Sequence, residues 1–359
     1  MRQVLFRIPV LQPLDLGPLG QWMLFGMGVL TALWILAALV WLLIRWRKRQ
    51  WTADDTTSLV FMVGIAAVLA FLPTILPRFA PDIAKLGIPI FGYGVMLFVG
   101  IVLALGLASW RSEHDGISPE VMLDLVVWLV VSGIIGGRMF FLLRYWDETF
   151  ADKTGASALF AAINLSSGGL VLHGAILGGV IALFLFCYRR RLNPWRIADI
   201  IMPSVFVGIA IGRIGCLLNG CCFGGICELP WAIQFPADSV PFQAYVARGF
   251  IPPDAPASPP LHPTQIYSTI DGLVIACVLL AYSPYKRRVG DIFGAGLLMY
   301  GITRFLVELL RSDEVGLFGT WFTGGQWISL MLIPIGIAIL TVPQEWLRGP
   351  ETKPLSTAE

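Results

Sequence analysis

Charged residues are scarce in this chain. They make up 13% of its 359 residues, against roughly 25% in soluble domains, while 57% of the residues are hydrophobic and the mean hydropathy is +0.77. The net charge is only +2, and no basic patch is interleaved with aromatic residues, which argues against a nucleic acid or another polyanionic partner. The composition predicts an integral membrane protein surrounded by membrane lipids.

Several common site motifs are also missing. The chain has no GxxxxGK[ST] run, which argues against a nucleotide-binding P-loop. Its cysteines form no CxxC pair, so we expect neither a metal site nor a cofactor. Four of them nonetheless fall within a short stretch: Cys216, Cys221, Cys222 and Cys227. In an oxidising compartment a disulfide among these four is an open alternative, in more than one pairing.

The first long apolar run has no basic segment before it and is followed by "RWRKRQW", the reverse of a cleavable signal peptide. We therefore expect a retained anchor. A helix needs about 20 apolar residues to cross a membrane, and nine segments are long enough. These are residues 21–44, 57–77, 90–110, 120–143, 168–188, 197–218, 264–283, 290–310 and 325–345.

Lysine and arginine are divided unevenly between alternate loops. Most of them follow the first, third, fifth, seventh and ninth predicted spans. The positive-inside rule therefore predicts that the N-terminus lies outside the cytoplasm and the C-terminus inside. The long polar loop 219–263 then lies outside, and its many prolines favour a loop or small cap over another helix. The tail, 346–359, is predicted to be disordered.

Charges inside apolar segments are candidates for a functional site, because burying one in a bilayer helix costs about 2.5–3.5 kcal/mol. In "MYGITRFLVELLR", Tyr300, Arg304, Glu308 and Arg311 recur every three or four residues and share one helix face. Arg304 and Glu308 can partly neutralise each other. The alternative is an ion pair that only holds helices together.

A second group of polar residues ends the predicted span 197–218. Arg213 and Asn219 follow small residues, Ser204, Gly208 and Gly212, which recur every four positions. Small residues at this spacing allow another helix to approach closely.

The same reasoning applies to "GGLVLHGAILGG", where Gly174 and Gly178 are four residues apart and flank the helix face next to His173. A lone histidine on an apolar helix is more often a packing residue than a catalyst. Both readings stay open at this point.

A third group, "HPTQIY", stands at the outer end of the span 264–283. Thr264 suits a helix cap, while His262 and Gln265 suit either a cap or a binding site. Together, arginines near membrane depth with tyrosine, histidine, asparagine and glutamine fit an anionic lipid headgroup, because guanidinium groups bind phosphate through paired hydrogen bonds.

Six motifs occur along the chain in a fixed order. They are "FGYGVML", "GGR", "GGLVLHGAILGG", "GRIGCLLNGCCFG", "HPTQIY" and "YGITRFLVELLR". This series resembles the prolipoprotein diacylglyceryl transferase family. The resemblance implies an all-α integral membrane protein with a seven-helix transferase core at 88–345, in which 219–263 caps the outer side between core helices 4 and 5. Residues 1–87 then form an N-terminal extension with two more transmembrane helices, and 346–359 a cytoplasmic tail.

The activity implied is transfer of the diacylglyceryl group of phosphatidylglycerol to the lipobox cysteine of a prolipoprotein signal peptide, in the bacterial inner membrane. This transfer is the first step of lipoprotein maturation and leaves glycerol phosphate. Two alternatives belong to other classes. One is a protein that binds or transports anionic lipid without chemistry, and the other is a membrane thiol–disulfide protein that uses Cys221 and Cys222.

The resemblance also implies roles for single residues. Arg213 and Arg304 hold the headgroup phosphate and stabilise the charge that develops as it leaves. Glu308 orients Arg304, and Tyr93 and Tyr300 are hydrogen-bonding neighbours of the headgroup.

The base that takes the proton of the substrate thiol is expected to be His173, with His262 as the second candidate. Asn219, Gln265 and Arg138 complete the expected headgroup contacts.

Three positions depart from the family pattern. Well-known members carry asparagine at the position of Cys216, glutamate at that of Cys221, and glutamate where Ser268 follows "HPTQIY". Roles assigned to those polar groups therefore do not transfer to this chain.

Overall fold

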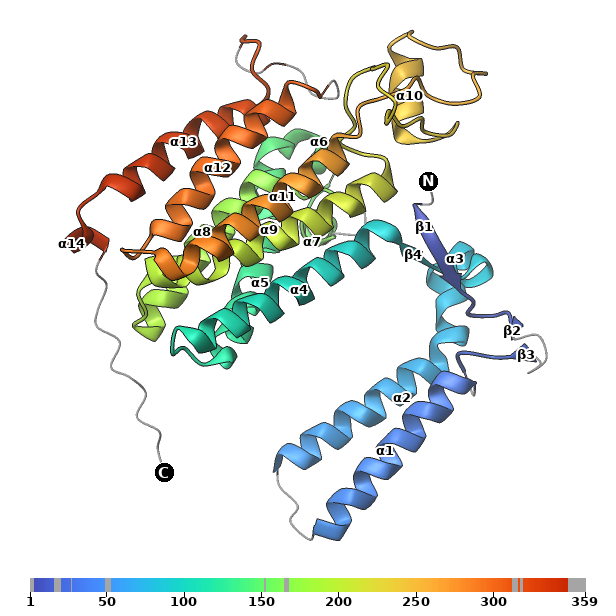
Figure 1. The fold of residues 1–359 in the computed structure, drawn as a ribbon. Coiled ribbons are helices and arrows are strands. Elements are labelled where there is room, and N and C mark those ends of the chain that lie inside the picture. The colour runs from blue at the N-terminus through green and yellow to red at the C-terminus, as the bar shows by residue number, and fades with distance from the viewer. Residues whose placement is uncertain are drawn as a thin grey trace. The chain divides into compact units, whose positions relative to one another are not determined.

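The computed structural model describes residues 3–15, 21–26, 28–48, 53–151, 153–164, 168–311, 316 and 319–347. Most of the predicted disordered tail, from residue 348 on, lies outside this part. The chain divides into two compact units that meet between Val95 and Met96, and each is described by itself. The part described is mostly helical, as an all-α membrane protein requires (Figure 1).

The N-terminal unit contains a helical hairpin. Helix α1 spans Val29–Lys48 and α2 spans Ala53–Phe79. Trp34 Nε1 of α1 donates to the carbonyl oxygen of Met62 in α2 at 3.0 Å. At the turn between the two helices, Arg45 and Asp55 form an ion pair at 2.8 Å.

Short strands flank this hairpin, which the sequence analysis did not foresee. Strand β1 (Val4–Ile8) pairs antiparallel with β4 (Ile88–Phe91), and β2 (Leu14–Asp15) pairs with β3 (Gln21–Trp22). The prediction of a helix from residue 21 is therefore wrong at its start, because residues 21 and 22 belong to β3. A short helix, α3 (Pro81–Leu86), precedes β4.

The second unit carries most of the long helices. Helix α4, which begins in the N-terminal unit, spans Gly92–His114, and the others are α5 (Pro119–Arg144), α6 (Trp146–Phe150), α7 (Ala156–Ile163), α8 (Leu172–Arg190), α9 (Pro194–Asn219), α10 (Val240–Ala247), α11 (Thr264–Tyr282), α12 (Asp291–Glu308), α13 (Gly324–Thr341) and α14 (Gln344–Leu347). A 3-10 turn, Ser283–Tyr285, follows α11.

Eight helices in the part described are long and apolar enough to cross a membrane: α1, α2, α4, α5, α8, α9, α11 and α13. The remaining predicted span, 290–310, corresponds to α12, whose eighteen residues include Asp291, Arg304 and Glu308. These charges set α12 apart from the other eight. Helix α12 packs against α9, α11 and α13, and the four lie side by side (Figure 1).

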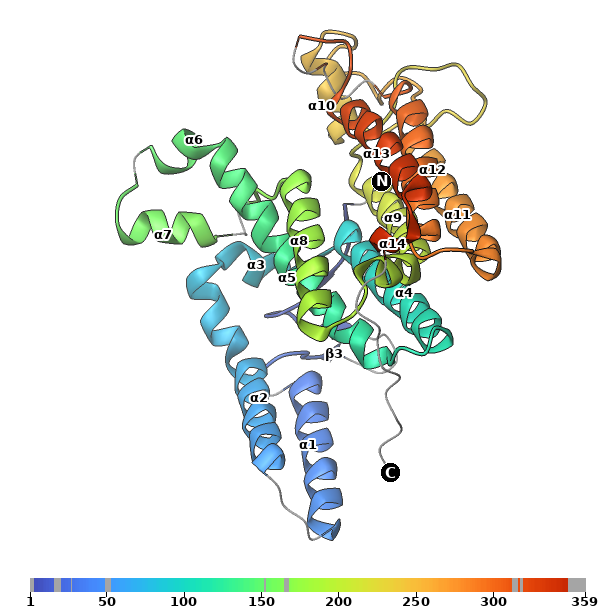
Figure 2. The same cartoon turned by 90° about the vertical axis from the view of Figure 1, so that its left-hand side faces the viewer.

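Helices α5 and α8 approach each other through glycines, as the sequence predicted for Gly174 and Gly178. A Cβ atom on Gly174 would lie 2.2 Å from the carbonyl oxygen of Gly136, and one on Gly178 would lie 2.4 Å from that of Ser132. Only glycine permits such contact. Figure 2 shows α5 and α8 side by side, with α6 and α7 extending from them.

The same prediction for α9 holds only in part. Gly208 faces α4, where a Cβ on Gly100 would lie 3.3 Å from the carbonyl oxygen of Gly208, but a Cβ on Gly212 would meet no described atom within 4 Å. Ser204 is buried. Close packing therefore involves the middle of α9 and not its last turns.

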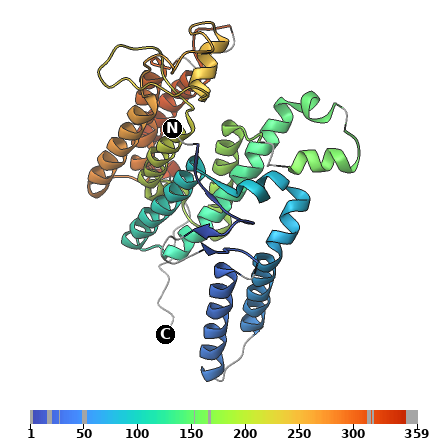
Figure 3. The same cartoon turned by 90° about the vertical axis from the view of Figure 1, so that its right-hand side faces the viewer.

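The loop 220–263 forms a small cap at the end of the bundle where α9 ends and α11 begins (Figure 3). Its core is made of Phe223, Phe235, Tyr245 and Leu261. The sequence argued against a helix here, yet the cap contains α10. Proline is tolerated in the first turn of a helix, where Pro241 lies, because that turn needs no backbone donor there.

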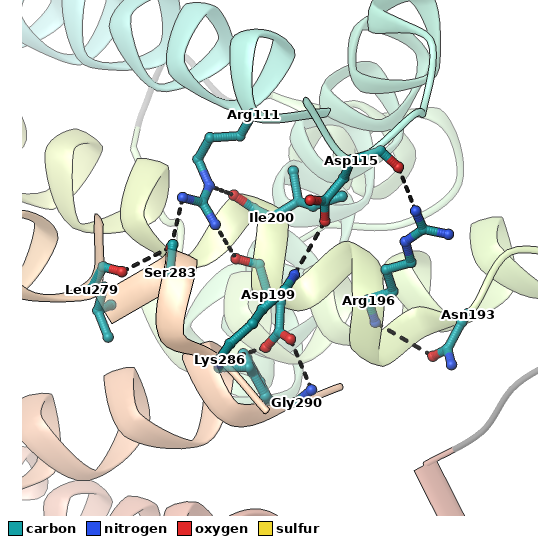
Figure 4. A network of polar contacts seen from close by, with 11 residues as sticks. Arg111, Asp115, Asn193, Arg196, Asp199, Ile200, Leu279, Ser283, Lys286 and Gly290 are labelled. Carbon is teal, nitrogen blue, oxygen red and sulfur yellow. Dashed lines mark hydrogen bonds and ion pairs between the residues drawn. The ribbon is translucent and has the colours of Figure 1, made fainter. Parts of the chain in front are cut away.

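A polar network fixes the opposite end of the bundle (Figure 4). Asp199 of α9 accepts a hydrogen bond at 2.8 Å from the backbone nitrogen of Gly290, at the start of α12. Arg111 of α4 donates to the carbonyl oxygen of Ile200 at 2.9 Å and to Ser283 Oγ at 2.8 Å. Four chain segments are thereby joined.

Two further cations, Lys286 after α11 and Arg196 in the first turn of α9, extend this network. Lys286 forms an ion pair with Asp115 at 3.2 Å, and Arg196 donates to the backbone oxygen of Asp115 (Figure 4). The sequence analysis had counted Arg111, Arg196 and Lys286 only as charges of cytoplasmic loops. Their partners lie far apart in sequence, which is why no local pattern reveals them.

Candidate functional site

The candidate site lies at the other end of the bundle, where α9 and α12 end and α11 and α13 begin. The chain leaving α9 is attached to α11 by two side chains. Thr264 Oγ1 donates to the carbonyl oxygen of Cys222 at 2.7 Å, and Gln265 Nε2 donates to that of Cys221 at 2.8 Å. Gln265, predicted as a substrate contact, therefore uses its amide group to position this turn.

Backbone hydrogen bonds attach the chain after this turn to the residues just before α11 and just after α12. Gly224 donates to the carbonyl oxygen of His262 at 3.1 Å, and Gly225 donates to that of Leu310 at 2.8 Å. A Cβ on Gly224 would lie 2.5 Å from the Cβ of His262, so a larger residue does not fit. The ends of α9, α11 and α12 are therefore held together closely.

A buried carboxylate organises the end of α12. Glu308, whose side chain is 0% exposed, forms ion pairs with Arg304 at 2.5 Å and with Arg311 at 3.3 Å. Its other oxygen accepts a hydrogen bond from Thr323 Oγ1 at 2.8 Å. The pairing of Arg304 with Glu308 expected from the helix face is confirmed, and Glu308 also joins α12 to α13.

Two residues of α13 belong to this cluster, and the sequence analysis missed both. Thr323 is the N-cap of α13, in a capping box with Gln326. The string "TGGQ" carries the signal for such a box. Gly325 lies against the ion pair: a Cβ there would lie 2.9 Å from Arg304 Nη2 and 2.9 Å from Glu308 Oε1.

Arg213 differs from Arg304 and Arg311 in having no carboxylate partner among the described residues. Within the described residues its guanidinium makes no hydrogen bond or ion pair, although it is mostly shielded from solvent. Its electrostatic neighbours are Tyr300, Cys216, Cys222 and Arg311. The cluster thus holds three guanidinium groups and one carboxylate, so an anion is the ligand that its charge favours.

Three thiols lie beside Arg213. The sulfur atoms of Cys216, Cys221 and Cys222 are all within 4.8 Å of one another. No disulfide joins them, and Cys227 is a free, buried thiol outside this group. Hydrogen bonds from Cys216 and Cys221, with the charges of Arg213 and Arg311, lower the pKa of the Cys222 thiol.

The remaining predicted residues at this end have defined surroundings. Asn219 lies within hydrogen-bonding reach of Cys221. His262 Nδ1 is 3.4 Å from the hydroxyl of Tyr267, which accepts a hydrogen bond from Trp231. Ser268 is nearly buried and donates to the carbonyl oxygen of Thr264 in its own helix.

Other predicted residues are not brought into the cluster. Arg138 of α5 is buried. It donates to the carbonyl oxygens of Ala161 and Ala162, in the last turn of α7, and of Gly168 and Gly169, which follow α7, at 2.6–3.0 Å. A guanidinium committed to four carbonyls has little left for a phosphate, so the function proposed below leaves Arg138 out.

His173 and Tyr93 lie on other elements. His173 is exposed at the start of α8, its ring is 6.2 Å from that of Phe140, and it makes no hydrogen bond within the described residues. Tyr93 is 42% exposed at the start of α4, in the N-terminal unit.

Comparison with known proteins matches this chain to one family. A family model described as prolipoprotein diacylglyceryl transferase matches residues 81–342. A phosphatidylglycerol–prolipoprotein diacylglyceryl transferase of Rhodopirellula baltica is 28% identical over 95% of this chain and 89% of the relative. A protein of that name from Clostridium tetani is 32% identical over 71% of this chain and 94% of its own length. The Clostridium perfringens protein named phosphatidylglycerol–prolipoprotein diacylglyceryl transferase 2 is also 32% identical, over 71% of this chain and 92% of its own length. The chain belongs to the prolipoprotein diacylglyceryl transferase family.

Proposed function

We propose that this chain transfers the diacylglyceryl group of phosphatidylglycerol to the thiol of a lipobox cysteine, the first step of bacterial lipoprotein maturation. The names of its relatives support both the lipid donor and the prolipoprotein acceptor. The observation that carries the proposal is the set of arginines at this end of the bundle, one of which, Arg213, has no carboxylate partner among the described residues.

The reaction replaces one bond of the lipid glycerol by another. A carbon–sulfur bond forms to the substrate cysteine, the carbon–oxygen bond to phosphate breaks, and its electron pair stays on the departing glycerol phosphate. The phosphate gains negative charge as it leaves, because a diester becomes a monoester. Arg213 and Arg304 are placed to bind this phosphate and to stabilise the added charge.

Glu308 positions these guanidinium groups and does not itself touch the lipid in this proposal. Its carboxylate holds Arg304 and Arg311 at the end of α12, and Thr323 holds the carboxylate. One negative charge among three positive ones leaves the cluster attractive to a phosphate. Tyr300, an electrostatic neighbour of Arg213, is a further headgroup contact in this proposal, with Asn219.

The thiol proton needs an acceptor, and we assign this role to His173. Its imidazole makes no hydrogen bond within the described residues, so both ring nitrogens are available to a substrate. His262, the alternative, already lies at 3.4 Å from the Tyr267 hydroxyl. Imidazole is the side chain best suited to accepting a proton near neutral pH.

The protein spans the membrane several times, and we propose that it lies in the bacterial inner membrane with its N-terminus outside. In this orientation the arginine cluster faces the outer side, where precursors carrying a lipobox are delivered. Arg196 and Lys286 lie at the other end of the bundle (Figure 4). In this orientation that end faces the cytoplasm, as the positive-inside rule expects for basic residues.

The test uses purified protein in phosphatidylglycerol vesicles with a lipobox peptide. The peptide should gain the mass of one diacylglyceryl group while glycerol phosphate is released. We expect Arg213→Ala to lower this rate by about 100-fold or more, the usual effect of removing a charge-stabilising donor. The matched control is Arg144→Ala, which removes an exposed arginine at the end of α5.

Two results would contradict the proposal. One is lipid binding by the wild-type protein without any transfer to the peptide. The other is a rate for Arg213→Ala that equals that of Arg144→Ala.

A further inference from the structure

The three thiols at the end of α9 have no part in the proposed transfer. Cys216 lies in the last turn of α9, and Cys221 and Cys222 lie in the turn that follows. Because the chain reverses at Gly220, whose φ is +78°, all three side chains gather at one place. The sequence spacing concealed this, since vicinal cysteines and one five residues earlier do not form a recognised metal motif.

The distances suit a single soft metal ion. A metal–sulfur bond is about 2.3 Å long, so three sulfurs around one ion lie roughly 4.0 Å apart in a trigonal arrangement. The thiols here are already within 4.8 Å of one another. Side-chain rotations that bring them closer by less than an ångström complete the arrangement.

The backbone around the thiols is firmly held. Thr264 and Gln265 donate to the carbonyl oxygens of Cys222 and Cys221. Cys222 has a φ of +60°, in the left-handed region that residues other than glycine rarely adopt. Such strained residues persist where the surrounding structure fixes them, and they cluster at ligand sites.

Ligand number and charge identify the ion. No histidine or carboxylate joins the three sulfurs among the described residues, so a tetrahedral zinc site would need a ligand from outside them. Three thiolates with one monovalent ion carry two negative charges. Arg213 and Arg311, both electrostatic neighbours of Cys222, supply two positive charges. Soft thiolate ligands select Cu(I), zinc and Fe–S clusters, and of these Cu(I) is the one that three sulfurs and two neighbouring arginines match in ligand number and charge.

We propose that Cys216, Cys221 and Cys222 form a binding site for one Cu(I) ion. Each thiol that binds releases its proton to the solvent, and the copper remains Cu(I) throughout. The proposed function adds a consequence, which rests on that function: a copper-loaded site engages Arg213, the arginine assigned to the lipid phosphate. Bound copper therefore lowers the rate of diacylglyceryl transfer.

Binding is tested without any assay of activity. Purified protein in detergent, kept reduced with ascorbate, competes for Cu(I) with a coloured Cu(I) chelator. We expect one equivalent bound, and X-ray absorption showing three sulfur neighbours and no nitrogen or oxygen. Cys222→Ser should weaken binding by more than about 100-fold, beyond the 10–100-fold typical of residues that only support a ligand. The matched control, Cys277→Ser, removes an exposed thiol of α11 and should bind as the wild type does.

Several results would overturn the site. Cys222→Ser could bind as much copper as Cys277→Ser does, or equimolar Zn(II) could displace the bound Cu(I). Mass spectrometry could also show a disulfide between two of these cysteines in the freshly purified protein. Gel filtration and thermal melting of each variant show whether a loss of copper reflects unfolding.

A second measurement tests the charge argument. Arg213→Gln should weaken Cu(I) binding several-fold, whereas Arg144→Gln should not. Copper inhibition is measured separately, as transfer by the wild-type protein with and without one equivalent of Cu(I). If copper binds without slowing transfer, the predicted inhibition is refuted and the copper site stands. If copper-free protein transfers no diacylglyceryl group, the proposed function is refuted and the copper site stands.

Discussion

Replacing Gly325 by alanine places a methyl group against the central ion pair of the site. The new carbon would lie 2.9 Å from both Arg304 Nη2 and Glu308 Oε1. Ordinary contact begins near 3.4 Å, so the pair must move by about half an ångström. A misplacement of about 1 Å at a reacting centre costs roughly 100-fold in rate, and half that distance predicts about a tenfold loss.

The assay is the rate of peptide modification at limiting phosphatidylglycerol, measured with the melting temperature of each variant. Crowding a packed site costs about 1–3 kcal/mol, so Gly325→Ala should also melt earlier. The control is Gly179→Ala in α8, where a Cβ meets no described atom within 4 Å. If Gly325→Ala keeps the rate of Gly179→Ala, Arg304 does not depend on this close contact and the assignment of the site is wrong.

Three further changes test other contacts. Glu308→Gln leaves Arg304 without its buried anionic partner. Breaking a buried ion pair costs about 3–5 kcal/mol, so we expect this loss of stability together with the loss of most of the transfer rate. An unchanged melting curve would contradict this. Arg138→Gln removes hydrogen bonds to the carbonyl groups of α7 and should lower the melting temperature. The KM for phosphatidylglycerol should stay unchanged, and a raised KM would show that Arg138 binds the headgroup. Gly174→Ala should separate α5 from α8, because the added carbon would lie 2.2 Å from the oxygen of Gly136; a double-cysteine crosslink between the two helices, formed as readily as in the parent, would refute this packing.

Local spacing predicted those parts of the site that lie on one helix. The recurrence of Tyr300, Arg304, Glu308 and Arg311 placed them on one face, and the pairing of Arg304 with Glu308 follows from a separation of one helical turn. The spacing of Gly174 and Gly178 in α8 likewise predicted that another helix approaches closely. A helix repeats with a fixed period, so its sequence contains this information.

Contacts between distant segments were not predictable in the same way. Glu308 meets Thr323 because α13 starts beside the end of α12, and Asp199 meets Gly290 across the bundle. Arg138 was expected at a headgroup and instead holds carbonyl groups of the segment around α7, since burial and charge alone do not reveal an arginine's partner. The three thiols gather through a turn whose geometry no cysteine spacing records.

The charges of α12 bear on how the protein is made. Arg304 lies within α12, while Asp291 and Glu308 are its first and last residues. The segment therefore enters a bilayer less readily by itself than an uncharged one does, since a charge near the centre costs about 2.5–3.5 kcal/mol. The partner that satisfies Glu308 across helices, Thr323, is synthesised only afterwards, at the start of α13. A nascent chain that stops before residue 323 lacks this donor, and we expect its α12 to insert into the membrane less efficiently than the α12 of a chain that includes α13.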